Sequence, residues 1–219
     1  MTTRYGADEL SRPVTQGEFR ALAEQFVRGG QFPAIVRDQH RSFRPEVVTK
    51  LPVRPPDGYE VYLEVDAAGA YSGPHTWHLR YHAGDASASK WRPVGAQVPL
   101  FFEVPTQENT TSTGFTDLAT VGPVVITPLA GDYFVLVNCR LTTAGGAGYA
   151  EAGLSVAGAA ATGILINGPT ASHETTTARL VRVLGAPAGT ALKLQYKTSA
   201  FTGFFMHRAI AVAPIRLGP

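Results

Sequence analysis

The segment "DYFVLVNCRL", residues 132–141, alternates with a period of two residues. In a β-strand this period places every second side chain on the same face. The positions that share one face are Tyr133, Val135, Val137, Cys139 and Leu141. We predict a strand with this face in a protein core. Cys139 is the single cysteine, so no intramolecular disulfide forms, and we expect a buried core residue rather than a reactive thiol.

Similar segments fill the chain from residue 59 onward, and turn signals rich in Gly, Pro, Asn and Asp separate them. The segments are 59–65, 75–82, 90–94, 99–104, 114–120, 123–127, 132–141, 148–158, 162–168, 176–184, 190–200 and 204–217. Short strands with regular turns and no helix between them indicate an antiparallel sandwich or barrel. Eight to ten strands favour a jelly roll, so we predict a mainly β protein. Its antiparallel jelly-roll β-sandwich spans 98–219, and a β-hairpin collar spans 59–97.

Residues 1–58 differ from the rest. Thr15 and Glu18 have the spacing of a capping box, which predicts a short amphipathic helix. Its apolar stripe is Phe19, Leu22, Phe26 and Val27. The Pro- and Arg-rich residues 31–58 then predict an extended, irregular arm. Helix and arm together suit an attachment segment, and whether the helix docks on its own chain or on a partner stays open.

Charge is unevenly distributed along the chain. The net charge of +2 is too small to suggest nucleic acid as a partner. Residues 98–219 contain only 7 Lys or Arg and 6 Asp or Glu, and a surface so poor in charge favours self-association. No apolar run approaches the ~20 residues of a membrane span. No signal peptide is recognised, so we expect synthesis in a cytoplasm and no membrane partner.

Three histidines, His75, His78 and His82, have a spacing that would bind zinc on a helix. The segment alternates like a strand, which places His75 and His78 on opposite faces. His78 and His82 would then lie roughly 13 Å apart at ~3.3 Å per residue. We therefore expect structural histidines and no metal or cofactor. A site shared by several chains at an oligomer axis remains an alternative.

Catalytic motifs are weak. Ser155 in "GLSVAG" resembles a nucleophile elbow, but that motif needs a following helix, and another strand is predicted there. We predict no catalytic residues and no enzyme.

Aromatic residues mark two further regions. Trp77, Leu79, Tyr81 and Trp91 are predicted to form the apolar face of the hairpin. Near the C-terminus, Phe204 and Met206 would face one way and Phe201 and Phe205 the other. One pair fits the core and the other fits an oligomer interface, so the interface candidates are Phe201, Phe204, Phe205 and Met206.

The run "WHLRYHAGDASASKWRPVG", residues 77–95, resembles a tryptophan hairpin of bacteriophage tail-fibre and minor-tail proteins. The matching residues are Trp77, Leu79, Arg80, Tyr81, Ser87, Lys90, Trp91, Val94 and Gly95. The layout of Pro128, Ala130, Gly131 and Tyr133 resembles the front of the C1q/TNF-like jelly roll. The resemblance covers roughly 59–219. It implies a non-enzymatic virion structural protein with a β-sandwich head that forms a trimer.

We therefore expect a tail-fibre or minor-tail component located in the virion. Residues 1–58 would bind other virion proteins and the jelly roll would be displayed. Binding of a host-surface glycan, with Trp77 or Trp91 stacking on sugars, is an additional hypothesis. Two alternatives stay open: a capsid decoration or head-fibre protein, and a host-surface polysaccharide hydrolase that uses Ser155.

Overall fold

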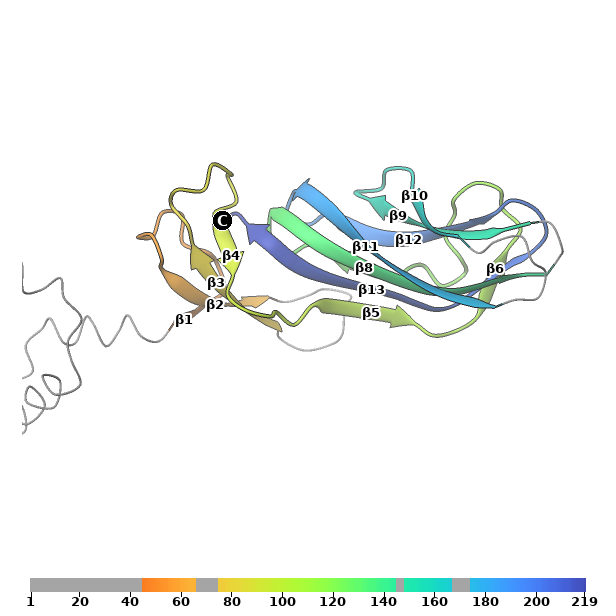
Figure 1. The fold of residues 1–219 in the computed structure, drawn as a ribbon, viewed down its shortest axis with the longest axis horizontal. Coiled ribbons are helices and arrows are strands. Elements are labelled where there is room, and N and C mark those ends of the chain that lie inside the picture. The colour runs from red at the N-terminus through yellow and green to blue at the C-terminus, as the bar shows by residue number, and fades with distance from the viewer. Residues whose placement is uncertain (1–44, 66–74, 145–147, 167–173) are drawn as a thin grey trace, which may run out of the picture. The chain divides into compact units, whose positions relative to one another are not determined.

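The strand β8 (Gly131–Thr143) lies in the larger of two sheets (Figure 1). The computed structural model describes residues 45–65, 75–144, 148–166 and 174–219. Every core position predicted in β8 is fully buried, while Phe134 and Leu136 between them are 39% and 44% exposed. The predicted strand and its core face are therefore confirmed. Burial also raises the pKa of the Cys139 thiol to about 12, so the thiol stays protonated at neutral pH.

The larger sheet is built around two long neighbouring strands. On one side β8 pairs with β11 (Thr175–Ala186), and on the other with β13 (Gly203–Leu217). The far side of β13 pairs in succession with β6 (Glu108–Thr110), β5 (Leu100–Val104) and β4 (Trp91–Pro93).

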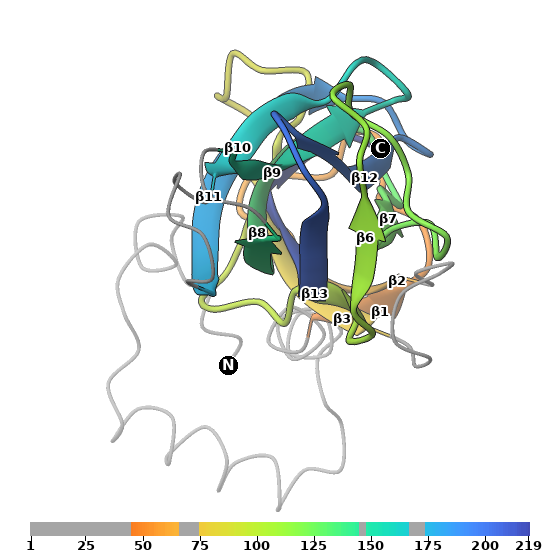
Figure 2. The same cartoon turned by 90° about the vertical axis from the view of Figure 1, so that its right-hand side faces the viewer.

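The smaller sheet packs over the larger one, and Figure 2 shows the two layers from the end. Its strands are β7 (Val124–Ile126), β9 (Ala150–Val156), β10 (Thr162–Ile166) and β12 (Ala191–Thr198). The order is β7-β12-β9-β10, all antiparallel. We count β5 and β6 as one interrupted strand and number it 1, and β7 to β13 then become strands 2 to 8. In these numbers the larger sheet has the order 1-8-3-6 and the smaller sheet the order 2-7-4-5. This is the strand order of a jelly roll, so the predicted fold is confirmed.

The hairpin region continues the larger sheet. It contains β2 (Glu60–Val65) and β3 (His75–Tyr81), and β3 pairs with β4, which meets β13 where Trp91 faces Leu217. Residues 45–219 form one compact unit, so the predicted boundary at residue 98 lies within it. One strand, β1 (Glu46–Val48), falls in the segment predicted as an irregular arm and pairs with β2 in parallel. That part of the arm prediction is therefore wrong, because Val47 and Val48 complete a sheet edge.

Two other predictions differ from the structure or fall outside it. Residues 114–120 form no strand; only Thr116 makes an isolated bridge, to Tyr196. Residues 108–110 form β6, which was not predicted. The predicted helix, with Phe19, Leu22, Phe26 and Val27, lies outside the described residues. No helix of the described residues has the length and apolarity of a membrane span.

The turn before β8 explains the motif that resembles the C1q/TNF-like family. A Cβ atom at Gly131 would lie 2.3 Å from the carbonyl oxygen of Arg216, so only glycine allows β8 and β13 to approach here. The Tyr133 hydroxyl donates a hydrogen bond to the Leu129 carbonyl at 2.5 Å. Both residues therefore close this end of the sandwich.

Candidate functional site

The hairpin tryptophans pack inside the protein. Trp77 and Trp91 are fully buried, and Tyr81 is 7% exposed. The indole N–H of Trp77 donates to the Val98 carbonyl at 3.0 Å, and the rings of Tyr81 and Trp91 meet edge to face, with centroids 5.4 Å apart. Leu79 is fully buried on the same face. Neither tryptophan is therefore exposed for stacking on a sugar.

His78 of β3 lies among charged side chains on the face opposite to the tryptophans. His78 Nε2 lies 2.9 Å from Glu60 Oε2, and the His78 ring lies 4.6 Å from that of Tyr62. Arg80 also pairs with Glu60, and this hydrogen bond lowers the pKa of the Glu60 carboxyl. Within the described residues no three His, Cys, Asp or Glu side chains form a cluster that could hold a metal ion.

Ser155 lies on β9 and is 2% exposed. Its hydroxyl donates to the Ala159 carbonyl at 2.7 Å. The turn that follows leads back through β10 rather than into a helix. The geometry of a nucleophile elbow therefore does not form around Ser155.

The predicted interface residues do not form one surface. Phe205 is fully buried between the sheets, with its ring centroid 4.8 Å from that of Tyr196. Phe204 and Met206 are partly exposed on the outer face of β13. Phe201 lies in the preceding loop with φ of 63° and is 55% exposed, so strand alternation does not extend to it. The interface prediction is corrected at Phe205, which belongs to the core.

A bulge in β13 reverses the alternation of its side chains. Met206 pairs with Arg140 and Ala209 pairs with Asn138, so one extra residue stands on β13. The extra residue lies at His207, whose φ is 47°. Phe205 points inward before the bulge, and Arg208 and Ile210 point inward after it.

The bulge therefore places Arg208 fully inside the sandwich. Its Nη1 lies 3.4 Å from Glu108 Oε2 and 3.3 Å from the Thr120 carbonyl oxygen, and its guanidinium lies over the Tyr196 ring. Nε and Nη2 have no hydrogen-bond partner among the described residues. Burial acts to raise the pKa of the Glu108 carboxyl, but hydrogen bonds from Thr120 and the charge of Arg208 outweigh it and lower that pKa.

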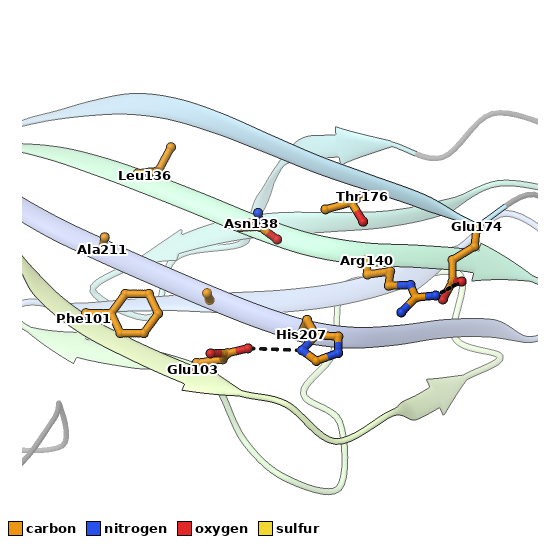
Figure 3. A pocket seen from close by; sticks show the side chains of 10 residues that line it. Phe101, Glu103, Leu136, Asn138, Arg140, Glu174, Thr176, His207 and Ala211 are labelled. Carbon is orange, nitrogen blue, oxygen red and sulfur yellow. Dashed lines mark hydrogen bonds and ion pairs between the residues drawn. The ribbon is translucent and has the colours of Figure 1, made fainter.

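The outer face of the larger sheet contains a groove of about 710 Å³ (Figure 3). Its floor is formed by small side chains of β13, Ala209 and Ala211, because alternate positions after the bulge face outward. Larger side chains on β5, β8 and β11 rise beside this floor. They are Phe101, Glu103, Leu136, Asn138, Arg140 and Thr176; Glu174 immediately precedes β11, and His207 lies at the bulge.

Two ion pairs organise the polar part of the groove. Arg140 pairs with Glu174, and His207 Nδ1 lies 3.2 Å from Glu103 Oε1. The side chains in both pairs are at least one-third exposed, so the pairs add little stability. They instead hold hydrogen-bonding groups in defined positions along the groove.

An apolar patch lies on the same face toward the edge strand β11. We define it as Phe134, Leu180 and Leu184, which are 39%, 58% and 57% exposed. Leu136, paired with Leu180, lines the groove and borders the patch. The exposed Arg182, which pairs with Phe134, lies between Leu180 and Leu184 on this face. Exposed apolar side chains with an arginine among them are a composition typical of protein contacts.

Sequence reasoning missed both the groove and the patch. The signal for the groove was present in "RAIAVAP", residues 208–214, where small residues alternate with larger ones. The patch was hidden because alternation assigns residues to two faces of a strand and does not say which face a second sheet covers.

Comparison with known proteins adds a distant likeness of fold. No family model matches the chain, and no curated protein matches it. Among solved structures, one from the Gx strain of infectious bursal disease virus matches with a TM-score of 0.38 and 12% identity. The match covers 65% of this chain and 39% of the viral one, so the chain spans well under half of that protein.

Two further matches are of the same kind. A crystal structure of the VP2 subviral particle of infectious bursal disease virus matches with a TM-score of 0.36 and 11% identity, covering 65% of this chain and 43% of the other. The C-terminal CBM6 of LamC from Zobellia galactanivorans matches with a TM-score of 0.29 and 16% identity, covering 51% of this chain and 98% of that one. These values indicate distant likeness among β-sandwiches and carry no functional argument.

Proposed function

We propose that the chain is a non-enzymatic structural protein of a bacteriophage virion, a tail-fibre or minor-tail component. Residues 1–58 attach it to other virion proteins, and the jelly roll is displayed as an oligomer. The tryptophan hairpin, residues 77–95, carries the resemblance to such proteins. Its buried Trp91 pairs with Leu217 at the end of β13, so hairpin and jelly roll share one sheet.

The observation that carries the oligomer is the apolar patch. Leu180 and Leu184 are more than half exposed on a strand that lies at the edge of the sheet. Covering apolar surface is favourable by about 25 cal/mol per Å², and a second copy of the chain supplies the same surface. Arg179 points toward the sandwich side of β11 and is exposed, a feature that opposes uncontrolled pairing of edge strands. A contact between subunits through outer-face side chains, rather than through pairing of edge strands, agrees with both the exposed leucines and Arg179.

We propose a trimer, following the layout that resembles the C1q/TNF-like family. Native mass measurement of the full chain at micromolar concentration tests it, and the expected mass is three times that of the chain. Leu180→Ser in the patch should shift the complex toward monomer. Val98→Ser is the matched control, because Val98 is 62% exposed but lies outside the patch. A wild-type monomer, or equal loss of mass in both variants, contradicts the proposal.

A further inference from the structure

We propose that the groove on the outer face of the larger sheet binds a neutral saccharide chain. The inference rests on the proposed display of the jelly roll on the particle, and it names the ligand that the displayed face takes. A subunit contact centred on Leu180 and Leu184 lies toward the β11 edge, whereas the groove extends to β5 on the other side of β13. The two surfaces meet at Leu136, and the part of the groove toward β5 lies away from the subunit contact.

The shape of the groove follows from its floor. From His207 to Ala211 the groove runs along four residue-to-residue steps of β13, about 13 Å at ~3.3 Å per step. Alanine side chains keep this strip low between larger neighbours, so an extended chain of more than one sugar ring can lie along the strand. A sugar ring presents C–H groups on its faces, and the partly exposed Phe101 ring and the alanine methyls give those faces an apolar contact.

The polar side chains match the edges of a sugar ring. Hydroxyl groups both donate and accept, so a sugar site needs both functions close together. Asn138 provides an amide that does both, Arg140 donates and Glu103 accepts. Figure 3 shows these three side chains on strands that flank β13, with Asn138 and Arg140 across the floor from Glu103. The ion pairs of Arg140 and Glu103 restrict their rotamers before a ligand binds, which reduces the entropy lost on binding.

Charge in the groove selects against acidic ligands. The lining contains one permanent cation, Arg140, and two carboxylates, Glu103 and Glu174. The formal charge of these groups is therefore −1, and a protonated His207 would raise it only to zero. Since Arg140 is already paired with Glu174, no unpaired cation is available in the lining for a phosphate, sulfate or uronate. A neutral saccharide is therefore favoured over an anionic polymer.

The test uses the full chain on an array of neutral glucan, galactan, arabinan and mannan oligosaccharides, with polygalacturonate as the acidic counterpart. Titration calorimetry with the best oligosaccharide then measures its Kd. We expect binding to at least one neutral oligosaccharide and none to polygalacturonate. Ala211→Leu, which fills the floor, and Asn138→Ala, which removes an amide, should each weaken binding by about tenfold or more. Val98→Leu, at a position that is 62% exposed and outside the groove lining, should leave Kd within about twofold.

Three results would overturn the inference. One is the absence of binding to every neutral oligosaccharide, and another is preference for polygalacturonate. The third is an Ala211→Leu variant that binds the oligosaccharide like wild type. If that variant also loses the oligomer, the groove is a subunit contact. Native mass and particle location are measured without any saccharide, so failure of this inference is distinguishable from failure of the proposed function.

Discussion

The buried Arg208–Glu108 pair gives an asymmetric prediction about stability. Arg208 is fully buried, while the Glu108 side chain is 15% exposed and accepts bonds from the Thr120 amide at 3.1 and 3.0 Å. Glu108→Gln leaves an uncompensated guanidinium inside the sandwich, because its other contacts are one carbonyl and the Tyr196 ring. Removing one partner of such a pair costs about 3–5 kcal/mol.

Arg208→Met should cost much less. It removes a charge with two unpartnered nitrogens and replaces it with an apolar side chain that fills similar space. Glu108 then keeps the Thr120 amide and its access to water. We expect a loss within about 1 kcal/mol, since apolar replacement of buried ion pairs is often neutral.

Urea unfolding at neutral pH, followed by fluorescence of the two buried tryptophans, measures both values. In thermal unfolding, melting temperatures should fall by about 6–20 °C for Glu108→Gln and by no more than about 4 °C for Arg208→Met, at ~2–4 °C per kcal/mol. All proteins are compared at one concentration, because self-association shifts apparent stability. An equal or larger loss in Arg208→Met would refute the reasoning.

The difference in the free energy of unfolding between wild type and Glu108→Gln should depend on pH, because the pKa of Glu108 is lowered in the folded protein. A carboxyl with a lowered folded-state pKa contributes stability above its ordinary value of 4.5, and that contribution disappears as the pH falls through the folded value. The gap between wild type and Glu108→Gln should therefore narrow below pH 4.5. A gap that stays constant on acidification would contradict this assignment.

Three other predictions concern the core and the hairpin. Phe205→Ala should destabilise the protein by about 3–5 kcal/mol through a cavity beside Tyr196. A decrease of less than about 1 kcal/mol in the free energy of unfolding, measured in urea, would contradict the burial of Phe205. Cys139, with a pKa of about 12, should resist a thiol reagent in the native state at pH 7.5 and react only after denaturation; rapid native labelling would contradict its burial. In a carboxyl NMR titration Glu60 should titrate below 4.5 and move upward in Arg80→Ala; an unchanged midpoint would assign the shift to another group.

The fold was predictable where one face of a strand meets a second sheet. In β8 the alternation of Tyr133, Val135 and Val137 follows directly from burial on one side. Strand positions and the jelly-roll class were recovered for this reason. Strand β1 and the irregular course of residues 114–120 were not predicted, because short segments depend on tertiary pairing more than on their own hydrophobic pattern.

The candidate site was harder to predict. A single inserted residue at His207 exchanges the two faces of β13, and no local signal distinguishes His207 from an ordinary strand residue. Uninterrupted alternation would place Arg208 outside, yet the bulge buries it and turns Ala209 and Ala211 outward. The floor of the groove depends on that reversal, so the alternation of small and large residues in 208–214 is visible in the sequence, but only the structure places the small ones on the outer face.

The location of the chain in an intact phage particle tests the central proposal most directly. Purified particles are separated into heads and tails, and each fraction is analysed by peptide mass spectrometry for residues 45–219. We predict stoichiometric peptides in the tail fraction. Peptides confined to heads would favour the capsid decoration or head-fibre alternative, and their absence from particles would contradict a virion structural role.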